Sequence, residues 1–280
     1  MKKVLSIIVS ALFVMSCGGG DSSNGPVIAE QSDYFDGSTY HRFYRYEEGI
    51  GYATSTDGIN FIKYTGNPVI NGPYVFPVLV YDDILYLIVR NHSTGEYGLY
   101  DVSIYTKPSF IRTILTGDYC NMAVSVVDGV WNALIEFHDG DYFFLMSSIM
   151  DSDGVFRSFT GFRGDAGNPT LEYIPERNAI LALYGADYRA TGVWRIRSGV
   201  YDLTTKTWKD MGVILSKTGV HLADPDLGIG NNTTPLLISI GYAQNSVATY
   251  KFIGTKLDLY DAIVNGDPIV LEDLGITMLP

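Results

Sequence analysis

The sequence predicts an all-β protein whose sheets repeat around a ring, a five-bladed β-propeller. Its composition favours strands, because aromatic residues make up 13% of the 280-residue chain and 21 residues are tyrosines. Apolar residues alternate with polar ones over short runs and do not recur at helical spacing. A strand–turn–strand pattern also recurs along the chain, and this repeat favours a propeller over other all-β folds.

Individual strands are predicted from short alternating segments bounded by turn residues. Pairs such as Asp36-Gly37 and Asp139-Gly140 are typical of the turns between neighbouring strands. We expect no helix beyond the apolar run at the N-terminus. The clearest expected strands cover residues 39–44, 84–89, 142–146 and 180–184.

Each repeat begins with a strand that starts at an X-Pro or X-Ala step and continues through a turn into a Tyr-rich strand. Successive starts lie about 48 residues apart on average, near the length of one four-stranded blade. A blade buries its faces only against neighbours, so we expect the ring to close, with residues 27–28 or 268–271 supplying a closing strand. A two-sheet sandwich is the alternative, and the repeat disfavours it. The aligned strand starts are Glu30, Phe76, Asn132, Asn168 and Asp224.

The N-terminus is predicted to direct export. Lys2 and Lys3 precede an apolar run over residues 4–15 that is too short to span a bilayer, so residues 1–16 are expected to be a signal peptide. The run ends in Val14-Met15-Ser16-Cys17, which resembles the lipobox of bacterial lipoproteins and implies lipidation of Cys17. An ordinary secretory signal is the alternative. Residues 17–26 then form the lipidated cysteine and a flexible tether, and residues 27–280 form the propeller domain.

We therefore expect an exported protein that its lipid anchors to the cell envelope. The residue after the cysteine is Gly18 and not an aspartate, which resembles the pattern of lipoproteins sorted to the outer membrane of a Gram-negative host. Loss of Lys2 and Lys3 with the signal lowers the formal charge from −12 to −14. Nucleic acid and anionic lipid surfaces are therefore not expected partners. The oligomeric state is not predicted.

No motif indicates a cofactor. The chain lacks the residue spacing of zinc, haem and phosphate-loop sites, so we assign no metal-ligating residue. A structural Ca²⁺ or Na⁺ ion on the ring axis stays open.

One part of the chain resembles a known group of enzymes. Residues 40–44, 50–61 and 66–70 resemble the first blade of five-bladed glycoside hydrolases of families 43, 32 and 130. The resemblance covers about 30 residues and extends to the other blades through their rhythm. It implies a propeller whose central pocket acts on a polysaccharide or oligosaccharide.

The same resemblance implies carboxylates at the starts of the innermost strands of blades one, two and three. Hydrolysis of a glycosidic bond requires one carboxylic acid to protonate the leaving oxygen and one carboxylate as base or nucleophile. Glu30 and Asp224 are the acids at the five aligned starts, and we predict them as catalytic residues. Asn132 stands where a general acid is expected, and an amide cannot donate that proton. The alternative for Asp224 is that an Asp-Pro step simply begins a strand after a turn.

Five further residues are predicted to bind the substrate. Arg163, in a Gly-rich loop, can clamp a uronate or sialate carboxylate, or it can pair with Asp165. Trp131 can stack on a sugar ring, as can Trp194, although a tryptophan at either position is more often a core residue. The predicted binding residues are Asn132, Trp131, Asn168, Arg163 and His221, and further candidate acids are Asp118, Glu136, Asp165 and Asp226.

Two classes of function follow from these residues. The first is a surface-anchored carbohydrate-active protein that cleaves or transfers a glycosidic bond. The second is a non-catalytic propeller lipoprotein that binds a glycan or protein through the same mouth.

Overall fold

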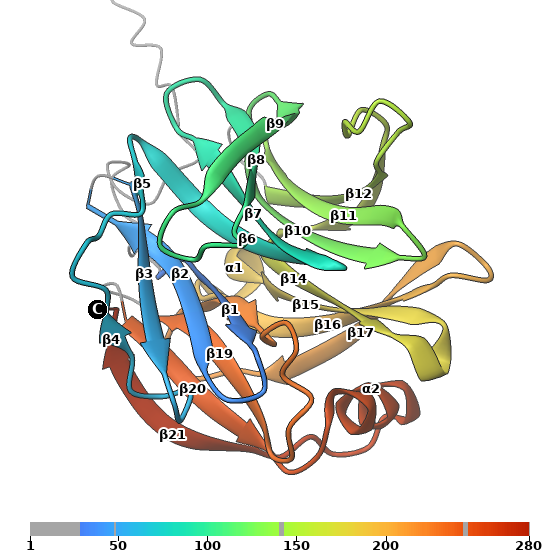
Figure 1. Cartoon of the computed structure of the whole chain (residues 1–280). Coiled ribbons are helices and arrows are strands. Elements are labelled where there is room, and N and C mark those ends of the chain that lie inside the picture. Colours follow the sequence, from blue (N-terminus) through green and yellow to red (C-terminus); the bar gives the residue numbers. More distant parts are fainter. Residues whose placement is uncertain (1–28, 48, 140–142, 243–245, 280) are drawn as a thin grey trace, which may run out of the picture.

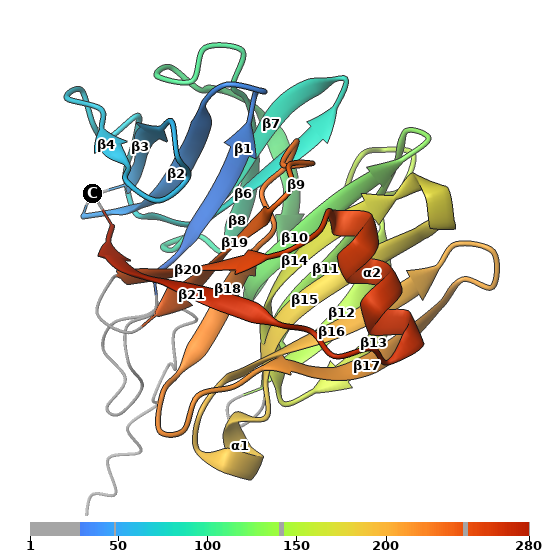
Figure 2. The ribbon, with the colours of Figure 1, turned by 90° about the horizontal axis from the view of Figure 1, so that it is seen from below.

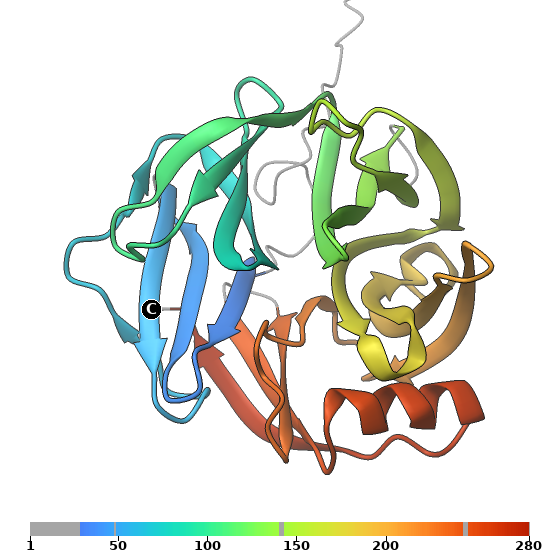
Figure 3. The ribbon, with the colours of Figure 1, turned by 45° about the vertical axis from the view of Figure 1, so that its right-hand side comes forward.

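The computed structural model is described for residues 29–279, apart from 48, 140–142 and 243–245. The predicted signal peptide, Cys17 and the tether lie outside the described residues. Five antiparallel sheets surround one axis in chain order, as Figure 3 shows. The prediction of a five-bladed β-propeller is therefore confirmed.

Each blade consists of consecutive strands, and the first strand of every blade lies innermost (Figure 1). The first strands contact one another in succession around the ring. Blade one contains β1 (Gln31–Phe35), β2 (Tyr40–Tyr46), β3 (Gly49–Ser55) and β4 (Ile62–Lys63), with β5 (Ile70–Asn71) paired to β3. Blade two contains β6 (Tyr74–Asp82), β7 (Ile84–Asn91), β8 (Glu96–Asp101) and β9 (Ser109–Thr116).

The remaining three blades repeat this order. Blade three contains β10 (Tyr119–Val127), β11 (Val130–His138), β12 (Phe143–Ile149) and β13 (Phe159–Gly164). Blade four contains β14 (Ala166–Ile174), β15 (Ala179–Ala186), β16 (Arg195–Asp202) and β17 (Thr207–Leu215). Blade five contains β18 (Leu222–Asp226), β19 (Leu236–Tyr242), β20 (Ser246–Phe252) and β21 (Leu271–Met278).

The hydrophobic core lies between the blades. Alternation along each strand sends apolar side chains to both faces, and each face packs on the next blade. Met122 and Ile135 of blade three, for example, pack with Ile88 of blade two. Similar clusters join blades one and two, three and four, and four and five. Each blade therefore buries its faces only when its neighbours are present.

Blades five and one close the ring without exchanging an outer strand in the described chain. Residue 271, expected in a closing strand, begins the outermost strand of blade five itself, and residues 27–28 lie outside the described part. Instead, the segment that follows β18 crosses to blade one. There Ile229 pairs in parallel with Tyr34, and its N–H donates to the Asp33 carbonyl at 2.9 Å. The free edge of β1 is therefore used to join the two ends of the ring.

A buried ion pair reinforces the same seam. Arg42, which is 2% exposed, donates two hydrogen bonds of 2.7 Å to the Asp33 carboxylate and one of 2.9 Å to Ser239 of blade five. Asp226 of blade five in turn accepts the Asp33 backbone N–H at 2.5 Å. Each of these charged groups is hydrogen-bonded, as buried charges require.

The expectation of no helix is wrong for one segment. Helix α2 (Lys256–Asn265) begins with a capping box, in which the Thr255 and Asp258 side chains each accept a backbone N–H of the other residue. Its buried Leu259 and Ile263 pack against blades four and five, and Figure 2 shows the helix along the outside of the ring. The other helical turns are η1 (Pro175–Arg177) and α1 (Tyr188–Thr191). Within the described chain, no helix has the length and apolarity needed to cross a membrane.

Candidate active site

The innermost strands begin at one end of the ring, and four of them are irregular at their start. The pairing register shifts between Val75 and Val78, and at the matching points of β10, β14 and β18. Phe76, Asn168 and Asp224 have positive φ angles of 54°, 49° and 51° at these points. An irregularity of this kind redirects a side chain and interrupts pairing. Four of the five inner strands are therefore irregular close to where they start.

The structure corrects the alignment of blade three. Asn132 lies on the second strand, β11, where it pairs with Ser125 on one side and Ile149 on the other. The equivalent position on the innermost strand, β10, is Asn121, which lies at the register shift between Tyr119 and Met122. The prediction of Asn132 rests on its Asn-Ala step, whereas Asn121 precedes a methionine. Even spacing would have identified Asn121, because it lies 47 residues before Asn168, close to the 46 residues that separate Glu30 from Phe76.

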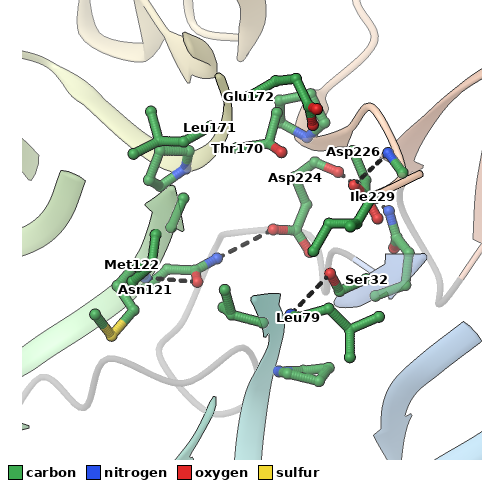
Figure 4. A pocket seen from close by; sticks show the side chains of 18 residues that line it. Ser32, Leu79, Asn121, Met122, Thr170, Leu171, Glu172, Asp224, Asp226 and Ile229 are labelled. Atoms are coloured by element: carbon green, nitrogen blue, oxygen red, sulfur yellow. Dashed lines mark hydrogen bonds between the residues drawn. The ribbon is translucent and has the colours of Figure 1, made fainter. Parts of the chain in front are cut away.

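Asp224 is buried at the axis (Figure 4). Its Oδ1 accepts a hydrogen bond of 3.0 Å from the Asn121 amide, whereas Oδ2 has no hydrogen-bond partner among the described residues. The side chain lines a narrow axial cavity of about 30 Å³. Burial raises the pKa of Asp224 well above its ordinary value, the nearby carboxylates of Glu30, Asp226 and Glu136 raise it further, and the Asn121 hydrogen bond opposes them.

Glu30 is held by two groups from different blades. Its Oε2 accepts the Phe76 backbone N–H at 2.9 Å, and its Oε1 accepts a hydrogen bond of 3.1 Å from Arg45. Burial raises the pKa of Glu30, while Arg45 and the Phe76 hydrogen bond act in the opposite direction. Glu30 therefore has a cation, Arg45, at hydrogen-bond distance.

Glu136 reaches the axis from the second strand of blade three. Its Oε2 accepts the Asn168 backbone N–H of blade four at 2.6 Å. A Cβ atom at Gly167 would lie 2.5 Å from the Glu136 carboxyl group, so the glycine permits this approach. Burial raises the pKa of Glu136 to about 7, the Asn168 hydrogen bond opposes this, and the negative charge of Glu30 adds to it. Sequence reasoning included Glu136 only among the further acids.

Glu30, Glu136 and Asp224 form what we call the axial acid cluster. They come from blades one, three and five. The charges of Glu30 and Glu136 raise the pKa of Asp224, and the charge of Glu30 also raises the pKa of Glu136. Carboxyl groups that repel one another in a buried site do not all ionise together. Burial and this repulsion both favour retention of a proton in the cluster, which is the condition for acid and base roles in one site.

Two of the predicted binding residues lie at this end of the ring. The Asn168 side chain accepts a hydrogen bond of 3.2 Å from the Asn121 amide, which joins it to the axial acid cluster. His221 directly precedes β18, and its ring packs against Tyr188 with the two ring centroids 5.6 Å apart. Its Nδ1 accepts the Trp194 backbone N–H at 3.4 Å, and burial lowers the pKa of His221. The imidazole is therefore neutral at pH 7.

Trp131 and Arg163 are held elsewhere. Trp131 is buried between blades two and three, and its Nε1 donates to Asp82 at 3.0 Å. Arg163 lies on the outermost strand of blade three, where it pairs with Asp187 at 3.1 Å and Asp210 at 2.8 Å. Its partners are therefore not the expected Asp165. Both side chains make structural contacts, and neither is brought to the axial acid cluster.

The described chain contains no group of three or more His, Cys, Asp or Glu side chains arranged to hold a metal ion. The axial carboxyl groups accept hydrogen bonds from backbone and side-chain N–H groups, as described above. The structural ion considered from the sequence stays a prediction.

The fold resembles that of solved glycoside hydrolases. A thermostable family-43 glycoside hydrolase superposes with a TM-score of 0.63 at 12% identity, covering 94% of this chain and 97% of the other. An endo-1,4-β-xylanase from Bacteroides thetaiotaomicron gives 0.60 at 11% identity, with coverage of 89% and 95%. A family 62 α-L-arabinofuranosidase domain from Coprinopsis cinerea gives 0.52 at 14%, with coverage of 94% and 96%. No family model matches the sequence, and no curated protein matches it significantly. At these identities the likeness shows the fold alone.

Proposed function

We propose that this chain is a surface-anchored, carbohydrate-active propeller that acts on an extracellular glycan at the axial acid cluster. Two observations support the proposal. The fold is that of glycoside hydrolases of families 43 and 62. The axis also carries carboxyl groups whose pKa values are raised by burial and mutual repulsion, and glycosidic bond cleavage uses a proton donor and a carboxylate. The cluster is the observation that carries the proposal.

The three acids differ enough to take separate roles. Burial and the neighbouring carboxylates favour the protonated form of Asp224, and its Oδ2 has no hydrogen-bond partner among the described residues, so we assign Asp224 the donation of a proton to the leaving oxygen of the glycan. Arg45 favours the ionised form of Glu30, which accepts a proton from water as general base. Glu136 maintains the raised pKa of Asp224 through its charge. The assignment gives each proton a donor and an acceptor.

A non-catalytic binding module is the second candidate, and three observations favour it. Phe76 and Asn121 occupy two inner-strand starts where the resemblance implies carboxylates. Glu30 and Glu136 accept backbone N–H groups of the following blade, which is also a structural role. The axial cavity of about 30 Å³ is the size of a water molecule, so a sugar ring requires the ring end to open.

Turnover of defined glycans separates these candidates. The panel comprises xylan, arabinan and β-1,3-galactan, since solved relatives of this fold are a xylanase, an arabinanase and a β-1,3-galactanase. Asp224→Asn and Glu30→Gln should each reduce turnover about a hundredfold while glycan affinity survives. Asp153→Asn, at a carboxylate that is 73% exposed, is the matched control. Unchanged turnover in the double variant would remove these residues from the mechanism, and binding without turnover by the unmodified protein would favour the second candidate.

The membrane anchor is a separate part of the proposal and rests on the sequence around Cys17. Acylation adds the mass of the fatty acyl groups to the peptide that begins at Cys17. The mass of the mature N-terminal peptide therefore decides whether Cys17 is acylated.

A further inference from the structure

A second cavity lies away from the axis, between blades three and four. It measures about 510 Å³, which suits one or two sugar rings. We call it the blade 3–4 groove. Its walls come from β11, β12 and β13 on one side and from β16 and β17 on the other, and its lining includes Asn132, Ser147, Thr160, Lys206, Thr207 and Trp208.

The charge of this groove differs from that of the rest of the chain. The protein carries a formal charge of −12, yet the residues lining the groove include no aspartate or glutamate. The axial cavity, by contrast, is lined by Glu172, Asp224 and Asp226. Lys206 is the charged residue of the groove. It is exposed, and the ion-paired lysines of the described chain are Lys217, Lys251 and Lys256. Lys206 therefore attracts an anionic group in the groove, and the lining residues include no carboxylate that would repel it.

An aromatic surface is fixed in the same groove. The centroid of the Trp208 ring lies 5.0 Å from the ring centroid of Phe162 in blade three and 5.0 Å from that of Tyr201 in blade four. Phe162 and Tyr201 also line the cavity. Packing on two sides holds the indole in one orientation, so a ligand does not have to order it. A rigid indole offers the apolar surface on which the C–H face of a sugar ring packs.

Neutral hydrogen-bonding groups surround this aromatic surface. The Asn132 amide is positioned by its hydrogen bond of 3.0 Å to the Val130 carbonyl, and the Ser147 hydroxyl by one of 3.3 Å to the Thr160 carbonyl. Thr160 and Thr207 add two more hydroxyl groups to the lining. Hydroxyl and amide groups both donate and accept, which matches the hydroxyl groups of a sugar.

We propose that the blade 3–4 groove binds an acidic sugar residue, a uronate, within a glycan chain. The sugar ring stacks on Trp208, its hydroxyl groups bond to Asn132 and the neighbouring hydroxyl side chains, and its carboxylate pairs with Lys206. The choice of a glycan rests on the proposed function, whereas the location and the preference for negative charge rest on the groove itself. Asn132, predicted from the sequence to bind substrate, then does so away from the axis.

Calorimetric titration of the full mature protein with trigalacturonate, and with xylotriose as the neutral comparison, tests this proposal. Trigalacturonate should bind at least about tenfold more tightly than xylotriose, and Lys206→Gln should remove that preference. Lys209→Gln is the matched control, because Lys209 is an exposed lysine of β17 that does not line the groove. Trp208→Phe should weaken binding of both sugars, and thermal melting checks that it folds.

Three results would overturn the inference: equal affinity for the two sugars, an equal loss of affinity in Lys206→Gln and Lys209→Gln, or no effect of Trp208→Phe. Binding is measured directly and does not depend on turnover. A protein that binds trigalacturonate at the groove but hydrolyses nothing in the panel would therefore contradict the catalytic proposal and leave this one intact.

Discussion

The buried ion pair at the seam of blades one and five provides the sharpest test of how the ring is held closed. Replacing Arg42 with methionine keeps an unbranched apolar stem and removes the guanidinium group. The Asp33 carboxylate then loses two hydrogen bonds of 2.7 Å, and Ser239 loses one of 2.9 Å. The pKa of Asp226, already raised to about 7 by burial and by Asp33, also loses the opposing charge of Arg42. Removing one partner of a buried pair costs about 3–5 kcal/mol.

For a domain of this size, that cost corresponds to a fall in melting temperature of roughly 10 °C. Urea unfolding at pH 7 gives the free energy directly. Arg177→Met is the matched control, because Arg177 pairs with Asp261 at 2.6 Å but the two side chains are 44% and 34% exposed. Such an exposed pair contributes about 0–1 kcal/mol.

The double variant Arg42→Met, Asp33→Asn isolates the electrostatic part. With the unpaired charge removed, more than half of the lost stability should return. A single Arg42→Met variant within about 1 kcal/mol of the unmodified protein, or a loss no greater than that of Arg177→Met, would refute the view that this pair closes the ring.

Three further predictions concern the axis, the anchor and the ring. Burial raises the pKa of Glu136 to about 7, so the folded protein binds this proton more tightly than the unfolded chain; stability should fall by roughly 3 kcal/mol as pH rises from about 4.5 to 7. Glu136→Gln keeps an acceptor for the Asn168 N–H and should flatten that part of the urea-unfolding profile, and an unchanged slope would contradict the assignment. Cys17→Ser should release the protein from the membrane fraction, whereas unchanged partition into detergent would refute lipidation. A chain that ends before His221 lacks blade five and exposes two blade faces, so it should lose cooperative melting; a sharp transition would argue against a closed ring.

The sequence alone determined the class of fold and two members of the axial acid cluster. Strand alternation and turn residues are local properties, so the rhythm of the repeats predicted five blades without any knowledge of contacts. Glu30 and Asp224 were found because each stands at the start of an inner strand, where the chain pattern is recognisable.

Only the tertiary structure decided which strand of blade three is innermost and which acids share the axis. Asn121 and Asn132 both stand near the start of a strand, and the choice depends on which strand edge faces the axis, a long-range property. Glu136 reaches the axis from a second strand, because Gly167 of the next blade leaves room for its carboxyl group. The pKa of Glu136 is raised because residues distant in sequence bury it. The pairing of Ile229 with Tyr34, which joins the ends of the ring, also links residues distant in sequence. The local sequence pattern predicts strands, whereas the burial and charge of side chains at the axis depend on how the five blades pack together.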